Sequence, residues 1–211
     1  MQKKRDILLH IGERLLARAP SFDDARELVP DWIPDVAFHD PPAPAAVLIA
    51  LVERACGISV VFTLRSKGLR AHSGQIAFPG GKLDEGDADP GEGALREAQE
   101  EIGLEREKAK ILGYMPSYLT GTNYLIIPVV AVVDGDVEFV ANPLEVDEVF
   151  EIPLDFIFRE ESFSTFSIKR GGRVHKTWQL GHDEHVIWGI TANLIRNFRD
   201  MVILDMDIAD E

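Results

Sequence analysis

Residues 78–103 read "FPGGKLDEGDADPGEGALREAQEEIG", and this stretch decides how the rest of the chain is interpreted. It contains two adjacent glycines, a run of acidic residues and then a segment with glutamates at helical spacing. Glu97, Glu100 and Glu101 stand at i, i+3 and i+4, so a helix would bring all three side chains onto one patch. Carboxylates that lie so close repel one another, and the stretch therefore needs a counter-charge.

The ends of this predicted helix are marked in the sequence. Asp89 suits the N-cap position, Pro90 suits the first helical position, and Glu92 completes a capping box. Gly103 is expected to stop the helix. The apolar residues at helical spacing should form the packed side, and they are Ala94, Leu95, Ala98 and Ile102.

A divalent cation would supply the missing counter-charge. Clustered carboxylates are hard oxygen ligands of the kind that Mg²⁺ or Mn²⁺ prefers. Gly80 and Gly81 let the chain bend in front of the helix and offer bare backbone carbonyls. Arg96 lies four residues from Glu100 and can brace a carboxylate by an ion pair. An arbitrary acidic helix is most often a solvated face, but the glycine bend favours a metal site that also holds phosphate.

The segment resembles the Nudix box, G-x5-E-x7-R-E-U-x-E-E-x-G-U, in which U is a bulky apolar residue. Gly81 fits its start, and the second half is matched by Arg96, Glu97, Glu100, Glu101, Gly103 and Leu104, with Ala98 at the first U. The acid of the first half is Asp87, and eight residues instead of seven separate it from Arg96. One Nudix subfamily has this longer spacing.

The preceding stretch "TLRSKGLRAHSGQIAFPGG", residues 63–81, resembles the signature of that subfamily, the coenzyme A pyrophosphatases. The signature is L-L-T-x-R-[SA]-x3-R-x3-G-x3-F-P-G-G, and it is matched by Thr63, Arg65, Ser66, Arg70, Gly74, Phe78, Pro79, Gly80 and Gly81. Val61 and Phe62 replace the two leucines. The stretch "IWGITANLI", residues 187–195, also looks like the tail of this subfamily. The two motifs together cover residues 61–104, about a fifth of the chain.

The resemblance implies an α/β (α+β) fold, the Nudix α/β/α sandwich with a mixed sheet. It implies metal-dependent hydrolysis of the diphosphate bond of coenzyme A or its derivatives, giving 3′,5′-ADP and 4′-phosphopantetheine. One alternative is a Nudix pyrophosphatase that acts on ADP-ribose or on dinucleotides such as NADH. An alternative of another class is a non-catalytic Nudix module that senses a nucleotide or binds RNA. Such modules often lose the acids of the box, whereas all three glutamates are present here.

The resemblance also implies roles for the residues of the box. Glu97 and Glu101 would be the main metal ligands, with Glu100 and the carbonyl of Gly81 as further ligands. The metal would neutralise the diphosphate and lower the pKa of a bound water, and a carboxylate would take the proton of that water. Arg96 would orient the glutamates without touching the substrate.

Which carboxylate acts as the base is left open by the sequence. Glu100 is one choice. Glu145 and Glu148 lie where some relatives supply an acid from a loop, and Asp87 is a further candidate; each is weighed against an ordinary solvent-facing acid.

A basic patch precedes the glycine bend. Arg65, Lys67 and Arg70 lie within six residues, and Lys82 follows the bend. Arginine suits phosphate oxygens, so Arg65 and Arg70 are expected to contact the substrate; the alternative is structural pairing with acids of the loop. His72 is a further candidate for substrate contact, weighed against a plain structural histidine.

Composition limits the other classes of function. The chain of 211 residues has a net charge of −14, which argues against a protein that grips nucleic acid or an anionic membrane. One cysteine, Cys56, excludes an internal disulfide and fits a reducing compartment. Charged residues interrupt any signal-like core near the start, and the expected location is cytoplasmic. The expected partner is a small-molecule substrate, and a homodimer is among the assemblies that the sequence leaves open.

The remaining chain predicts mostly strands with a few helices. Residues 5–18 have helical spacing and form an N-terminal helical arm, residues 1–39, joined by the proline-rich stretch 39–46 to a Nudix hydrolase domain, residues 40–211. Strands are expected at residues 45–54, 58–65, 110–118 and 124–133, and Pro128 should put an edge or a bulge in the last of them. Residues 148–158 predict a strand that runs into a short helix, and residues 185–202 predict the terminal helix.

Overall fold

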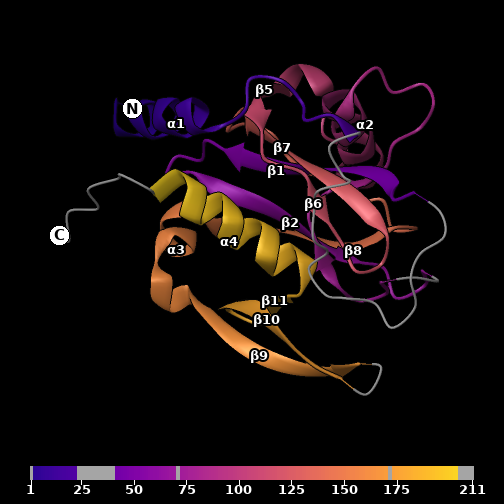
Figure 1. Ribbon diagram of the computed structural model, residues 1–211. Helices are drawn as coiled ribbons and strands as arrows, with labels where there is room; N and C mark the ends of the chain where they lie inside the picture. The colour runs from indigo at the N-terminus through magenta and orange to yellow at the C-terminus, as the bar shows by residue number, and fades with distance from the viewer. Residues whose placement is uncertain (1, 23–40, 70–71, 171–172, 204–211) are drawn as a thin grey trace.

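The computed structural model describes residues 2–22, 41–69, 72–170 and 173–203. Among these residues, helix α2 (Pro90–Ile102) covers one face of a large mixed sheet and helix α4 (Ile190–Ile203) covers the other (Figure 1). A smaller antiparallel sheet lies beside α4 (Figure 1). The predicted α/β (α+β) class, with a mixed sheet between helices, is confirmed.

The large sheet has eight strands within the described residues, and its main path runs β3–β2–β1–β7–β5. Its strands are β1 (Ala43–Val52), β2 (Ser59–Arg65), β3 (Ile76–Ala77), β4 (Gly80–Lys82), β5 (Ala109–Tyr114), β6 (Tyr118–Leu119), β7 (Tyr124–Val133) and β8 (Val146–Pro153). Strand β4 pairs with β1, β6 pairs with β7, and β8 pairs with β2. The pairing of β1 with β7 is parallel and the other pairings of this sheet are antiparallel. The short helical segments are η2 (Arg106–Lys108), α3 (Leu154–Phe158) and η3 (Glu160–Ser162).

Strand β1 explains why its sequence is almost continuously apolar. Alternate side chains of a strand point to opposite faces of the sheet. Leu48 and Ala50 pack in the cluster under α2, whereas Ile49 and Leu51 pack in the cluster under α4. Because both faces are covered, the strand carries no polar face, as predicted from its sequence.

The prediction that Pro128 lies in an edge strand is wrong. Strand β7 is an interior strand, paired along its whole length with β1 and on its other side with β5 and β6. The carbonyl of Pro128 accepts from the N–H of Met115 at 2.9 Å, in the connection between β5 and β6. The N–H and C=O of a strand residue point to the same side. The position where proline lacks an N–H therefore also faces the β5–β6 connection, where no strand ladder requires a donor from residue 128.

The C-terminal third contains elements that the sequence did not predict. Strands β9 (Phe163–Arg170), β10 (Arg173–His182) and β11 (His185–Trp188) form the small antiparallel sheet. The predicted terminal helix over 185–202 is therefore shorter at its start: residues 185–188 are strand, Gly189 turns the chain at φ 66°, and the helix is Ile190–Ile203. A left-handed φ of this kind favours glycine.

The N-terminal helix α1 (Gln2–Arg14) packs on the body of the molecule. Ile11 is fully buried in the cluster that also contains residues of α4. After the helix, Leu16 and Tyr114 of β5 exchange two backbone hydrogen bonds of 2.9 Å. The predicted boundary at residues 39–40 lies outside the described residues, and residues 43–46 of the predicted join belong to β1. None of the described helices is long and apolar enough to cross a membrane.

Replacing Ile11 with alanine should lower the free energy of unfolding by about 2–4 kcal/mol, because it removes a fully buried side chain. Denaturant unfolding would measure this effect. Leu9 lies in the same helix with 58% of its surface exposed, so Leu9→Ala is the matched control and should change the free energy by less than about 0.5 kcal/mol. Equal effects of the two substitutions would show that α1 is not held by its buried face.

Candidate active site

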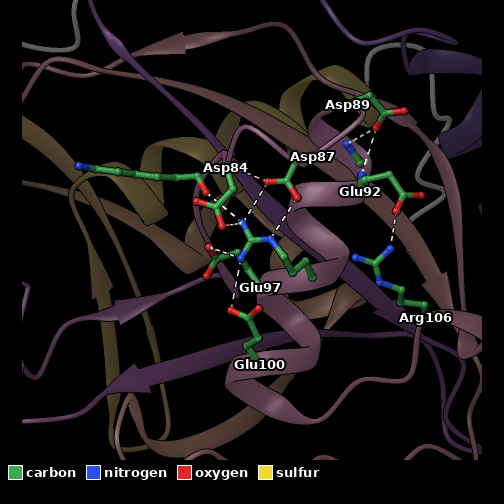
Figure 2. Close-up of polar contacts among 10 residues, drawn as sticks. Asp84, Asp87, Asp89, Glu92, Glu97, Glu100 and Arg106 are labelled. Atoms are coloured by element: carbon green, nitrogen blue, oxygen red, sulfur yellow. Dashed lines mark hydrogen bonds and ion pairs between the residues drawn. The ribbon is translucent and has the colours of Figure 1, made fainter.

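Helix α2 begins and ends where its sequence predicts. Asp89 is the N-cap, and its Oδ1 accepts from the N–H groups of Gly91 and Glu92 at 2.7 and 3.1 Å. Gly103 closes the helix at φ 66°, the left-handed conformation that favours glycine at this position. The carboxylate of Glu92 pairs with Arg106 (Figure 2), whereas the predicted capping box had it return to the cap.

The three glutamates of α2 lie at different depths. The predicted packed side is buried, and it consists of Ala94, Leu95, Ala98 and Ile102. The side chain of Glu101 is 2% exposed, that of Glu97 is 17% exposed and that of Glu100 is 53% exposed. Glu101 therefore lies deepest, Glu97 lies at an intermediate depth and Glu100 lies nearest to solvent.

Arg96 ties the preceding loop to the helix. Its Nε and Nη2 donate to the two carboxylate oxygens of Asp87, each at 3.0 Å, and its Nη1 donates to Glu97 at 3.1 Å and to Glu100 at 3.3 Å. Figure 2 shows these three carboxylates and that of Asp84 gathered around one guanidinium group. The hydrogen bond from Arg96 lowers the pKa of Asp87. Arg96 thus positions two of the three glutamates, and Asp87 anchors Arg96.

Glu101 is a buried carboxylate with few compensating contacts. Its Oε2 accepts from the N–H of Gly80 at 3.1 Å, and its Oε1 lies 3.3 Å from Nη1 of Arg65. Burial raises the pKa of Glu101 to about 7, although the Gly80 N–H and Arg65 oppose the rise. The negative charges of Glu97 and Glu145 raise it further. Glu101 is therefore the carboxylate whose charge is least stabilised by the protein alone.

Glu97 rests against the backbone of the glycine bend. A Cβ added at Gly81 would lie 2.5 Å from Oε1 and 2.7 Å from Oε2 of Glu97, so a side chain at position 81 would occupy the space of this carboxylate. Burial raises the pKa of Glu97, Arg96 opposes the rise, and the charges of Glu100 and Glu145 add to it. The Glu97 carboxylate thus packs directly against the Gly81 backbone.

The structure separates the two acids that the sequence placed together near residue 145. Glu148 of β8 shares a face with Phe150, which packs in the cluster under α4. Its carboxylate oxygens lie 3.2 Å from Nε2 of His185, whose ring stacks on Phe150 with centroids 3.7 Å apart. Glu148 therefore lies on the face of the sheet opposite to α2.

Glu145, in contrast, belongs with the glutamates of α2. It precedes β8, and its carbonyl accepts from the N–H of Ser66 at 2.8 Å, which holds the 145 loop against the end of β2. Its charge raises the pKa values of both Glu97 and Glu101. Of the predicted additional acids, Glu145 acts on Glu97 and Glu101, Asp87 is joined to Glu97 and Glu100 through Arg96, and Glu148 lies apart.

The predicted substrate contacts have different surroundings. Arg65 pairs with Glu101, which is the structural pairing that the sequence left as an alternative, and it also lines a cavity beside the glycine bend. His72 is exposed, has a left-handed φ of 55° and places Nδ1 at 2.8 Å from Oε1 of Gln75. It lines the same cavity. Arg70 lies outside the described residues.

This cavity of about 550 Å³ lies on the α4 side of the sheet. Strand β4 (Gly80–Lys82) forms one wall, and the glutamates contact the same strand through Gly80 and Gly81. The opposite walls come from β10, β11 and the start of α4, including residues of the stretch 187–195 that the sequence analysis singled out. Lys176 also lines the cavity, and it belongs to no motif that the sequence predicts.

Comparison with known proteins identifies the family of this chain. Residues 42–167, which run from β1 into β9, match the NUDIX domain. The chain belongs to the Nudix family. The predicted family is confirmed, and the chain is a Nudix pyrophosphohydrolase.

Several Nudix relatives match most of the chain. A protein of Citrobacter koseri is 39% identical over 152 residues, which are 72% of this chain and 79% of the relative. Proteins of Klebsiella pneumoniae and Escherichia coli are 38% identical over the same shares. Each is named an uncharacterized Nudix hydrolase, NudL. Among solved structures, DR0079 of Deinococcus radiodurans aligns with a TM-score of 0.49 and 14% identity over 87% of this chain and 96% of that one. RenU, a Nudix hydrolase of M. smegmatis, aligns with a TM-score of 0.48 and 20% identity over 59% and 79%.

Nudix hydrolases use divalent metal ions, and the residues at the glycine bend fit such an ion. In the structure, no three His, Cys, Asp or Glu side chains of the described residues form a ready metal site, because Arg96 holds Glu97 and Glu100 while Arg65 and Gly80 hold Glu101. Burial is the main cause that raises the pKa values of Glu97 and Glu101, and the charges of neighbouring glutamates add to it. A divalent cation would offset this uncompensated negative charge.

The metal-free Nudix protein should lose stability as the pH rises from 5 to 8. The folded state binds a proton at Glu101 up to a pKa of about 7, compared with the ordinary value of 4.5 in the unfolded chain. The folded state therefore holds more protons in this window, and the stabilisation present below pH 4.5 is lost as the pH rises through 7. The loss should be about 3 kcal/mol. Asp87, whose pKa is lowered, acts in the opposite direction and only at more acidic pH.

Urea unfolding at several pH values, with a chelator present, measures this dependence. Glu101→Gln should remove most of the slope. A free energy of unfolding that stays constant or increases between pH 5 and 8 would contradict the burial of a charged Glu101.

Proposed function

We propose that this Nudix enzyme hydrolyses the diphosphate bond of coenzyme A or its derivatives, giving 3′,5′-ADP and 4′-phosphopantetheine. One observation carries the proposal. The stretch that resembles the coenzyme A pyrophosphatase signature, residues 63–81, lines the cavity and ends at the glycines against which the glutamates rest. The stretch 187–195, which resembles the tail of the same subfamily, lines the opposite wall.

Glu97 and Glu101 are the proposed main metal ligands, with Glu100 and the carbonyl of Gly81 as further ligands. When bound, the metal ion would neutralise the diphosphate and make a water molecule more acidic. Arg96 is a positioning residue, because it contacts Glu97 and Glu100 and is anchored by Asp87.

In the proposed reaction, a water oxygen attacks one phosphorus of the diphosphate and the bond from that phosphorus to the bridging oxygen breaks. The bridging oxygen leaves with the other phosphate, and the water's proton passes to a carboxylate. Glu145 and Glu100 are the two candidates for this base: Glu145 because its charge acts on both Glu97 and Glu101, and Glu100 because it is the most exposed glutamate of the helix. Glu148 is a poorer candidate, since it lies on the opposite face and pairs with His185.

Arg65 and His72 are proposed to contact the substrate from the wall of the cavity, and Arg70 is proposed to do so from the same signature. Residues 1–39 are proposed to form an arm that contributes to stability and not to the chemistry. The helix in this arm packs against α4 and β5.

A substrate panel tests the proposal. Purified protein is incubated with coenzyme A, ADP-ribose or NADH, with Mg²⁺, with Mn²⁺ or with a chelator, and the products are separated by chromatography. Metal-dependent release of 3′,5′-ADP, with kcat/KM for coenzyme A roughly tenfold or more above the other two substrates, is the expected result. A preference for ADP-ribose or NADH would assign the rival pyrophosphatase activity. Binding of these compounds without any turnover would assign a nucleotide-sensing module.

A further inference from the structure

The hairpin made by β9 and β10 has a charge opposite to that of the rest of the chain. Residues 163–182 contain four lysines and arginines and no acidic residue. The whole chain contains 22 lysines and arginines and 36 acidic residues, and its net charge is −14. A basic segment of this length in so acidic a chain favours an anionic ligand at this place.

The residues that line the cavity are likewise more basic than the rest of the chain. None of its described lining residues is an aspartate or a glutamate, although acids make up 36 of the 211 residues. Its cationic lining residues are Arg65, Lys82 and Lys176. Arg65 and Lys82 lie at the glycine bend, where the diphosphate is proposed to bind. Lys176 lies on the separate small sheet, so the diphosphate alone does not account for it.

Lys176 is an exposed residue of β10, and it lines the cavity together with its neighbours His175 and Thr177. Alternate residues of a strand share a face, so Lys176 shares one with Trp178 and Leu180. Leu180 is fully buried, and the ring of Trp178 lies 3.8 Å below the guanidinium of Arg196 in α4. In the part of the chain that the structure describes, Lys176 forms no ion pair. Lys169, in contrast, pairs with Val174 near the tip of the hairpin and does not line the cavity.

We propose that Lys176 holds a second phosphate of the substrate, remote from the diphosphate that is cleaved. This inference rests on the proposed function, and there the group is the 3′-phosphate of coenzyme A. Strand β10 lies beyond residues 42–167, the part that matches the Nudix domain. Strand β10 thus adds to the Nudix domain a wall that distinguishes a nucleotide with a 3′-phosphate from one without it.

Turnover of two substrates that differ only in this phosphate tests the proposal. For Lys176→Ala, kcat/KM should fall roughly 10- to 100-fold with coenzyme A and by less than about twofold with 3′-dephospho-coenzyme A, the scale of one lost charge-assisted hydrogen bond. Lys176→Arg should retain most of the preference for coenzyme A. Lys169→Ala is the matched control on the same hairpin and should change neither value. Thermal unfolding of each variant shows whether the fold is kept.

Binding of the products by calorimetry makes the subsite testable apart from the proposed activity. The unmodified protein should bind 3′,5′-ADP more tightly than 5′-AMP, and Lys176→Ala should remove this difference. If coenzyme A is not hydrolysed but the difference depends on Lys176, the subsite stands and the proposed function falls. If coenzyme A is hydrolysed but Lys176→Ala affects both substrates equally, or neither, the subsite is overturned and the function stands. Equal weakening of oligonucleotide binding by the Lys169 and Lys176 variants, with turnover unchanged, would also overturn it and assign the hairpin to nucleic acid.

Discussion

Replacing Glu101 with glutamine should lower kcat for diphosphate hydrolysis by more than ~100-fold, the scale expected when a catalytic metal loses a charged ligand. The amide keeps the shape of the side chain and can still accept from the Gly80 N–H. The substitution also removes a buried carboxyl group whose pKa is raised to about 7 and which is therefore mostly charged at pH 8. Because the buried charge destabilises the folded state, the metal-free variant should be more stable than the unmodified protein at that pH. Lost activity together with gained stability cannot result from a damaged fold.

Steady-state turnover at saturating Mg²⁺ and urea unfolding with a chelator measure the two effects. Glu107→Gln is the matched control, because this exposed acid lies just beyond α2, in η2. It should change neither turnover nor stability. Near-normal turnover of the Glu101 variant at saturating metal would remove Glu101 from the proposed ligands.

Gly81→Ala should lower activity by roughly 10- to 100-fold with little change in stability. The added Cβ would lie 2.5 Å from a carboxylate oxygen of Glu97, which must move away. Because this oxygen is the end of a flexible side chain, the displacement costs the fold little, yet it moves a proposed metal ligand. The variant should therefore need a higher Mg²⁺ concentration for half-maximal activity.

Gly86→Ala provides the control in the same segment, since a Cβ there would meet no heavy atom within 4 Å. Metal titrations of turnover and thermal unfolding of both variants separate the effects. A loss of stability in Gly81→Ala as large as its loss of activity would show that β4 itself is disturbed. Unchanged metal dependence would show that Gly81 does not contribute to the proposed metal site.

Local signals in the sequence were sufficient for the metal helix and the central strands. The N-cap, the first-turn proline and the closing glycine of α2 act through neighbouring residues, so their positions follow from spacing alone. The burial of β1 on both faces likewise follows from its almost continuous run of apolar residues.

The rest depends on which face of the sheet a residue occupies. Glu145 and Glu148 are three residues apart, yet one adjoins the glutamates of α2 and the other pairs with His185. The edge strand predicted at Pro128 is wrong for the same reason, because only the arrangement of neighbouring strands shows where its backbone points. The β9–β10 hairpin had a local signal, two strand-like runs around Gly171 and Gly172, which could have been recognised from the sequence.

The position of Gly80 and Gly81 between the carboxylates and the cavity has an evolutionary consequence. The carboxylates belong to α2, whereas part of the cavity is built by β10, β11 and the start of α4, which come later in the chain. Substitutions in β10, β11 or the start of α4 can reshape the pocket while leaving the hydrolytic machinery untouched. A Nudix scaffold of this design can diversify its choice of substrate by exchanging its C-terminal segment, and chimaeras that join the first 160 residues to the tail of a relative are a direct way to redirect it.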